Sequence, residues 1–264
     1  MMKFFDSLTH ATADGTWLGG TRYDASLDRL LTEMDGQAYR ACLVNIAGYQ
    51  DNETLADFAS KYPDLFVPIG GFDPSKYSDI AQIETEIKKF SDRGFAGLKL
   101  HPRLNSYDPL DEKCIATISL AAKYNLVIFL DTLFRQKTVI TTHPADAIDA
   151  IAIKCPDTKI VLLHGGGGHL LDIYEIVRMR EKLLLDVSFT IMRYAGSSID
   201  LDIGFLCRTL DLRLTVGSDF PEYTPAQAKQ QLLKLVPDLP QEKLENICFR
   251  NLEKLFQDWQ GFKH

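Results

Sequence analysis

The chain has 264 residues, of which 45% are hydrophobic and 25% charged, and it carries 29 basic and 36 acidic side chains. This composition is typical of a soluble globular protein of one or two domains. The net charge of −7 argues against nucleic acid and anionic membranes as general partners, and no apolar run reaches the roughly 18 residues that a membrane span needs.

The five cysteines are scattered and form no CxxC pair, and the N-terminus MMKFFDSLTH lacks an apolar stretch with a small-residue cleavage site. We therefore expect a reduced, cytoplasmic protein without a secretory signal. No linker, low-complexity segment or repeat divides the sequence, so we expect one domain over residues 1–264.

Eight apolar, β-rich runs alternate with stretches of helical period. The predicted strands are residues 3–5, 41–47, 65–70, 96–100, 126–130, 159–163, 183–187 and 213–216. The predicted helices are residues 26–35, 53–61, 80–92, 112–123, 145–154, 170–181, 199–210 and 226–235. The strand starts recur roughly every 30 residues, which is the length of a βα unit.

Eight such units in a chain of this length predict a (β/α)8 TIM barrel, and an open doubly wound sheet is the alternative. The tail, residues 241–262, is predicted to form two short helices. Leu252, Leu255, Phe256 and Trp259 share one apolar face at helical spacing. We expect these C-terminal helices to cap the barrel.

Ionisable residues follow most of the predicted strands. Active sites of such barrels lie at the carboxyl ends of the strands, so these side chains are expected at one shared rim. In chain order they are Asp6 and His10, Asp73, Lys99 with His101 and Arg103, Asp131 with Arg135, His164, Asp186 with Arg193, and Asp219.

His10, His164 and Asp219 follow the first, sixth and eighth predicted strands. Two imidazoles and one carboxylate are ordinary ligands of zinc, and the same set can hold iron or manganese. A purely structural role is the alternative for these residues. Asp219 can cap the turn before Pro221, and a lone histidine such as His10 often only forms hydrogen bonds within the protein.

Lys99, His101 and Arg103 alternate with other residues, so a period of two places them on one side of the strand or its extension. Together with Arg135 and Arg193 they form a cationic rim suited to an anionic, carboxylate-bearing substrate. The alternative to substrate binding is that Arg135 and Arg193 are solvated loop residues and that Lys99 forms an internal ion pair.

Four glycines follow His164. They can form a tight turn or cradle a phosphate at a helix N-terminus. Because no GK[ST] sequence follows them, a nucleotide P-loop is excluded and the tight turn is the expected role.

These residues resemble the amidohydrolase superfamily, in the amidohydrolase-related branch that contains aminocarboxymuconate-semialdehyde decarboxylase. The matching segments are GFAGLKLHPR (94–103), PDTKIVLLHGGGG (156–168), LTVGSDFP (214–221) and FRNLEKLF (249–256), with a partial match at DSLTH (6–10). The resemblance implies a (β/α)8 barrel and a divalent metal, zinc or manganese. It also implies that Asp219 is both ligand and general base, and that the protein forms a homodimer.

Two positions depart from the pattern of this branch. The first histidine of its HxH pair is Leu8 here, and the histidine after strand five is replaced by Asp131. Leucine cannot ligate a metal, whereas aspartate can and prefers harder ions. Either a metal is held by His10, Asp131, His164 and Asp219, or none binds.

We therefore expect an enzyme that hydrolyses a small carboxylated lactone, ester or amide, with Asp219 as general base and His164 as the second catalytic residue. Lys99, His101, Arg103, Arg135 and Arg193 are expected to bind the substrate. The alternatives are a decarboxylase of the same branch and a barrel without catalytic activity that binds a carboxylated metabolite or a partner.

Overall fold

The computed structural model describes residues 2–133 and 142–261. Its eight strands form one parallel sheet in the order β1 to β8, which confirms the predicted (β/α)8 barrel. The strands are β1 (Phe5–Thr9), β2 (Arg40–Val44), β3 (Phe66–Phe72), β4 (Gly97–Leu100), β5 (Val127–Asp131), β6 (Ile160–Leu163), β7 (Leu183–Asp186) and β8 (Leu214–Thr215).

Hydrogen bonds between the first strand and the segment after β8 close the ring. The backbone N–H of Asp219 donates to the carbonyl of Leu8 at 2.9 Å, and that of His10 donates to the carbonyl of Phe220 at 3.0 Å. Thr9 and Phe220 form a parallel bridge beside them. The sheet is therefore a barrel and not the open doubly wound alternative.

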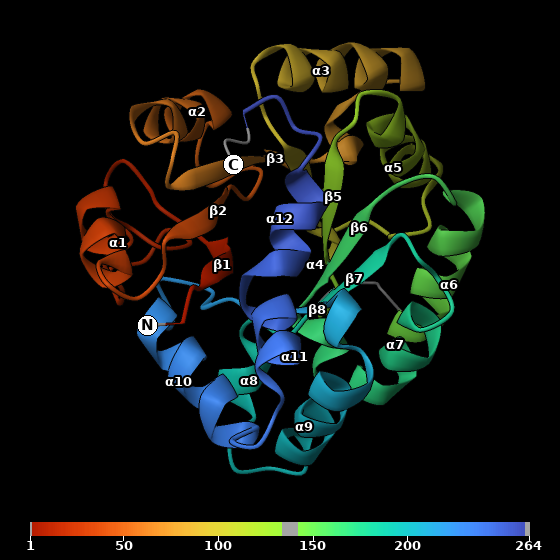
Figure 1. Ribbon diagram of the computed structural model, residues 1–264. Helices are drawn as coiled ribbons and strands as arrows, with labels where there is room; N and C mark the ends of the chain where they lie inside the picture. Colours follow the sequence, from red (N-terminus) through yellow and green to blue (C-terminus); the bar gives the residue numbers. More distant parts are fainter. Residues whose placement is uncertain (1, 134–141, 262–264) are drawn as a thin grey trace.

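Helices surround the barrel, and the chain passes from one to the next in order around the ring (Figure 1). They are α1 (Leu27–Met34), α2 (Asn52–Lys61), α3 (Ile80–Asp92), α4 (Pro102–Asn105), α5 (Glu112–Lys123), α6 (Pro144–Lys154), α7 (Leu170–Val177), α8 (Thr190–Arg193), α9 (Ile199–Thr209), α10 (Pro225–Leu235), α11 (Gln241–Glu245) and α12 (Asn251–Phe256). Among the described residues, no helix is both long and apolar enough to cross a bilayer.

The prediction for the first strand is wrong in its position, because β1 begins at Phe5 and continues through polar residues. Asp6 and Ser7 lie fully buried inside it. Oδ1 of Asp6 accepts a hydrogen bond from the backbone of Ser218 at 2.9 Å, and the Ser7 hydroxyl donates to Asp186. These distant partners satisfy polar groups whose burial would otherwise be costly.

The C-terminal helices cap the amino end of the barrel, as predicted, and α12 crosses in front of the strands in Figure 1. Leu252 and Phe256 are buried in the apolar cluster that fills the barrel interior, and Leu255 and Trp259 pack against it. A π-helical turn (Asn246–Arg250) joins α11 to α12.

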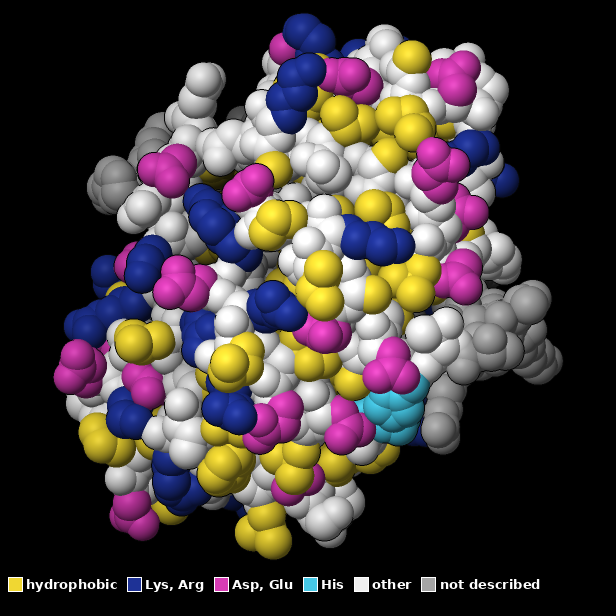
Figure 2. All heavy atoms as spheres, turned by 90° about the vertical axis from the view of Figure 1, so that its right-hand side faces the viewer, with side chains coloured by type: hydrophobic (Ala, Val, Ile, Leu, Met, Phe, Trp, Pro, Cys, Tyr) yellow, Lys and Arg dark blue, Asp and Glu magenta, His cyan; other side chains and the backbone are white. Residues whose placement is uncertain are grey.

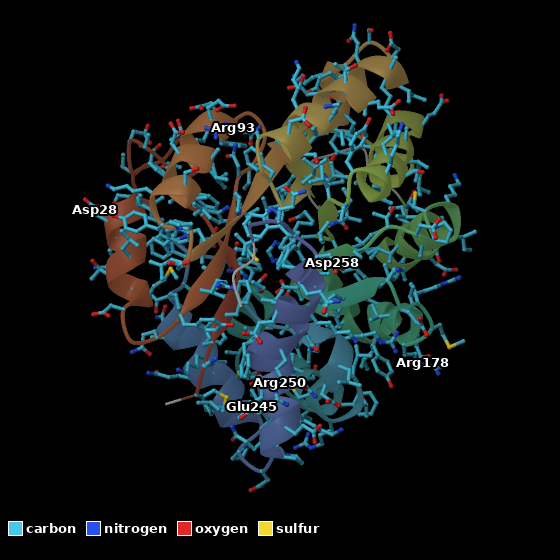
Figure 3. All side chains as sticks on the ribbon, turned by 45° about the horizontal axis from the view of Figure 1, so that its top comes forward. Asp28, Arg93, Arg178, Glu245, Arg250 and Asp258 are labelled. Atoms are coloured by element: carbon cyan, nitrogen blue, oxygen red, sulfur yellow. The ribbon has the colours of Figure 1, made fainter. Side chains whose placement is uncertain are left out.

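Two ion pairs lie at the surface of this tail, one within the tail and one between the tail and the barrel. Glu245 and Arg250 lie next to each other and form an ion pair (Figure 3). Near the other end of the tail, Asp258 accepts from Lys159 at 3.4 Å. The exposed pairs contribute little free energy, so burial of the apolar face holds the cap in place.

We predict that Phe256→Ala destabilises the protein by about 3–5 kcal/mol, because it opens a cavity at the base of the barrel. The Phe256 ring centroid lies 6.3 Å from that of Phe5 and 6.4 Å from that of Phe129. Chemical denaturation measures the free energy of unfolding, with Leu212→Ala, at a side chain that is 70% exposed, as the control. A loss equal to that of the control would contradict the assignment of α12 as the cap.

Candidate active site

A cavity of about 660 Å³ opens at the carboxyl ends of the strands. Most of the predicted site residues line it: His10, Lys99, His101, Arg103, His164, Arg193 and Asp219. Asp131 lies against this group and is fully buried. Arg135 falls outside the described residues.

His10 and Asp219 meet across the seam between β1 and the segment after β8. Nδ1 of His10 donates to the carbonyl of Val44 at 2.6 Å, so Nε2 is the nitrogen that faces the site. Nε2 lies 3.4 Å from Oδ1 of Asp219. Burial alone would raise the pKa of Asp219, but the hydrogen bond from His10 and the nearby charge of His164 lower the pKa below its usual value.

The carboxylate of Asp131 lies among three nitrogen donors. Its Oδ2 is 3.3 Å from Nε2 of His101, 3.3 Å from Nε2 of His164 and 3.6 Å from Nη2 of Arg103. Burial opposes ionisation, yet these groups lower the pKa of Asp131 well below its usual range. Asp131 thus supplies a fixed negative charge beneath the cavity.

The two histidines beside Asp131 respond differently to it. Burial lowers the pKa of His101 to about 3 despite the carboxylate. For His164, burial also acts to lower the pKa, but Asp131 and Asp219 outweigh it and raise the pKa above the usual value. Nδ1 of His164 donates to the carbonyl of Ser188 at 3.1 Å, which orients the ring.

Lys99 comes from β4 and is only 2% exposed, yet it lines the cavity. Burial lowers the pKa of its ammonium group, and the carboxylates of Asp131 and Asp219 act in the opposite direction. Its Nζ forms no hydrogen bond or ion pair with any described residue. A buried amine that faces a cavity without a protein partner is available to a ligand.

His101 and Arg103 reach the cavity by a route that the period-two prediction did not include. The strand ends at Leu100, and the next residues form the short helix α4 with His101 as its N-cap. Arg103, the second residue of this helix, lines the same cavity as Lys99. The three side chains line one cavity, and a strand followed by the start of a helix, not a continued strand, brings them there.

Three residues after successive strands have left-handed backbone conformations. The φ angles are +66° for His164, +60° for Phe189 and +57° for Asp219. Such angles are uncommon for residues with a side chain and persist where the surrounding structure enforces them. They direct the side chains of His164 and Asp219 towards the cavity.

The glycines after His164 form a tight turn, as predicted. Gly165, Gly166 and Gly167 all have positive φ angles, between 54° and 72°. The N–H of Gly166 donates to the hydroxyl of Thr132 at 2.7 Å, which joins the turn to the end of β5.

Sequence reasoning did not identify Trp17 and Glu222. The Trp17 ring packs against His10 at a tilt of 32° with a centroid distance of 4.6 Å, and its Nε1–H donates to Glu222 at 3.3 Å. Both residues also line the cavity. They lie in loops, where no periodicity marks a residue as part of a site.

The metal site that the resemblance implies does not fit the arrangement of the cavity floor. Leu8 is fully buried in the apolar interior of the barrel. The remaining predicted ligands form two pairs, His10 with Asp219 and His164 with Asp131. Ligands about 2.1 Å from one ion lie within roughly 4.2 Å of one another. Among the described residues, no three ligand atoms of the floor lie within 4.8 Å of one another.

A model of the amidohydrolase family matches residues 13–257, and the chain belongs to this family. No curated protein sequence matches the chain closely enough to count as a relative. The family and the barrel predicted from the sequence are thus both confirmed.

Several solved structures have the same fold. An uncharacterised TIM-barrel protein from Bordetella bronchiseptica has a TM-score of 0.80 at 18% identity, over 97% of this chain and 99% of that one. A probable 2-pyrone-4,6-dicarboxylic acid hydrolase from Acinetobacter baumannii, with citric acid bound, has a TM-score of 0.71 at 16% identity, over 97% and 100%. A 5-carboxyvanillate decarboxylase from Novosphingobium aromaticivorans, complexed with manganese, has a TM-score of 0.70 at 15% identity, over 97% and 96%.

We predict that stability falls as the pH rises because of Asp6. Burial raises the pKa of this carboxyl from 3.8 to about 7. Between these values the folded protein holds a proton that the unfolded chain has released, so the free energy of unfolding decreases with pH and levels off above pH 7. From pH 5 to pH 8 the contribution of Asp6 is a loss of roughly 2–3 kcal/mol.

Asp6→Asn keeps the shape of the side chain and removes this titration. The variant should lose less stability than the wild type between pH 5 and pH 8, as measured by urea unfolding at both values. Asp28→Asn, on the surface of α1, is the control and should follow the wild type. Parallel profiles for the wild type and Asp6→Asn would contradict the assignment.

Proposed function

We propose that this protein is an enzyme that hydrolyses a lactone, ester or amide bond in a small molecule bearing one or more carboxylates. One observation carries the proposal. A single cavity holds three cationic side chains, Lys99, Arg103 and Arg193, together with a carboxylate base, Asp219. Cationic side chains bind carboxylates strongly when they are partly desolvated, and a buried carboxylate can activate water.

Lys99 and the two arginines have separate roles in this proposal. The Lys99 ammonium has no described protein partner, so a substrate carboxylate or carbonyl oxygen is its natural ligand. Nη2 of Arg103 lies 3.6 Å from Oδ2 of Asp131, and this ion pair holds the planar guanidinium in place. Arg193 lies on α8 at the side of the cavity and contributes a second guanidinium.

Asp219 and His10 form the basic pair. A water molecule beside Asp219 can give its proton to the carboxylate, and Nε2 of His10, 3.4 Å from Oδ1, holds that carboxylate in place. His164 lines the cavity, and its two ring nitrogens are engaged by Ser188 and Asp131, so it acts on the attacked carbonyl through its positive charge, which the raised pKa favours. This assignment uses no metal, because the floor does not provide three gathered ligands.

The names of the structural neighbours support a carboxylated substrate. The hydrolase named above is described as acting on a pyrone dicarboxylic acid, and the decarboxylase on a carboxylated vanillate. Decarboxylation is therefore the second candidate reaction. In both cases the cationic side chains hold a carboxylate against a buried, polar floor.

We predict that Asp219→Asn lowers kcat by about 10²–10⁴-fold, because the variant cannot accept the proton of water. The assay uses 2-pyrone-4,6-dicarboxylate and simple lactones for hydrolysis, and 5-carboxyvanillate with detection of CO2 for decarboxylation. Asp258→Asn, at the opposite end of the barrel, is the control. Unchanged turnover in Asp219→Asn would overturn the role of this residue.

We also predict that Lys99→Met weakens binding of citrate by at least about tenfold, because the apolar stem remains but the ammonium is lost. Isothermal titration of the whole protein measures the dissociation constant, with Lys88→Met on the surface of α3 as the matched control. Equal affinities would remove Lys99 from the binding site. Binding without turnover of any member of the panel would favour a binding protein over an enzyme.

A further inference from the structure

A second group of ligating side chains lies at the mouth of the cavity, apart from its floor. His143 is the N-cap of α6, His169 ends the glycine turn, and Asp172 lies in the first turn of α7. Among the described histidines, His143 and His169 are the two that are not buried. Figure 2 shows histidine side chains gathered at one place on the surface, with acidic side chains beside them.

The three side chains point at one another. Nε2 of His143 lies 3.1 Å from Nδ1 of His169. Oδ2 of Asp172 lies 3.7 Å from Nε2 of His143 and 3.5 Å from Nδ1 of His169. These separations match those between the ligands of one tetrahedral ion, which are about 3.4 Å when each ligand is near 2.1 Å from the metal.

We propose that His143, His169 and Asp172 bind a divalent transition-metal ion, with Zn²⁺ as the preferred species. Two imidazoles and one carboxylate are a common set of protein ligands for zinc. Among the described residues, this is the only group of three histidine, cysteine or carboxylate side chains whose ligand atoms all lie within 4.8 Å. Asp172 is 56% exposed at its side chain, so water can complete the coordination.

One existing contact must change when the metal binds. Nδ1 of His143 accepts a hydrogen bond from the backbone N–H of Ala145 at 3.3 Å, so the proton of the neutral ring is on Nε2. Coordination through Nε2 moves this proton to Nδ1 and gives up the long bond to Ala145. Pro144 occupies the first position of α6 and favours the start of the helix without that bond.

The glycine turn explains how His169 reaches this place. Gly167 has a φ of +61°, and a Cβ atom there would lie 2.9 Å from Cδ2 of Leu133. The chain therefore turns tightly under the mouth of the cavity and emerges at His169, beside His143. This gives the glycine run a role beyond the orientation of His164.

The ion would add positive charge at the entrance of the cavity. His169 and Pro144 line the same cavity as Arg193. A cation here attracts anions of the kind that the proposed function requires. The binding of the ion itself does not depend on which reaction the cavity performs.

Titration of the chelator-treated, full-length protein with ZnCl2 tests the proposal by calorimetry. We expect one Zn²⁺ per chain for the wild type, and dissociation constants raised by at least about tenfold in His143→Gln, His169→Gln and Asp172→Asn. Glu175→Gln, also on the surface of α7, is the matched carboxylate control and should bind as the wild type does. The five cysteines are all buried and do not compete for zinc.

A second readout separates binding at the mouth from binding on the floor and from misfolding. Zn²⁺ should raise the melting temperature of the wild type and of His10→Gln, and should not raise that of His143→Gln/His169→Gln. The melting curve of each variant without zinc shows that it folds. Absence of binding up to millimolar zinc, unchanged affinity in the histidine variants, or loss of binding in His10→Gln alone would each overturn the proposal.

Discussion

The hydrogen bonds between the first strand and the segment after β8 are the interaction on which the rest of the molecule depends. The backbone N–H of Ser7 donates to the carbonyl of Val216 at 3.4 Å, and the backbone N–H of Asp219 donates to that of Leu8 at 2.9 Å. These bonds join the two ends of a ring of eight strands. The pairing of His10 with Asp219 exists only because the ring closes, since more than 200 residues separate them in the chain.

The charges in the cavity are balanced by side chains. Isolated buried charges are costly, and here both carboxylates of the cavity floor have nitrogen groups beside them. Asp131 lies between His101, His164 and Arg103, and Asp219 lies beside His10. Side chains of the protein itself, Arg103 among them, therefore supply positive charge to the buried floor.

Periodicity was sufficient to predict most of the fold. The bounds of α3 and α5 agree with the predicted ranges because their apolar residues repeat at helical spacing after an N-capping aspartate, Asp79 or Asp111. The first strand was misplaced because Asp6 and Ser7 interrupt the apolar run. Their burial depends on Ser218 and Asp186, which lie far along the chain and cannot be recognised from local sequence.

The candidate site was predictable to the extent that strand ends share one rim. The lining of the cavity by Lys99, His101 and Asp219 follows from that geometry. The pairing of His10 with Asp219 and of His164 with Asp131 could not be predicted in this way, because it depends on distances between side chains. The contact of Trp17 with His10 comes from a loop without any repeating pattern, so only coordinates reveal it.

The cap on the amino end of the barrel has a consequence for how this chain can change. The cap packs on the interior at one end, whereas the cavity opens at the other. The packing that stabilises the barrel and the cavity that could bind a ligand therefore lie at opposite ends of the barrel. Gains in thermal tolerance acquired beneath α12 are free to accumulate without altering the entrance, and they provide a reserve against which new specificities at the mouth can evolve.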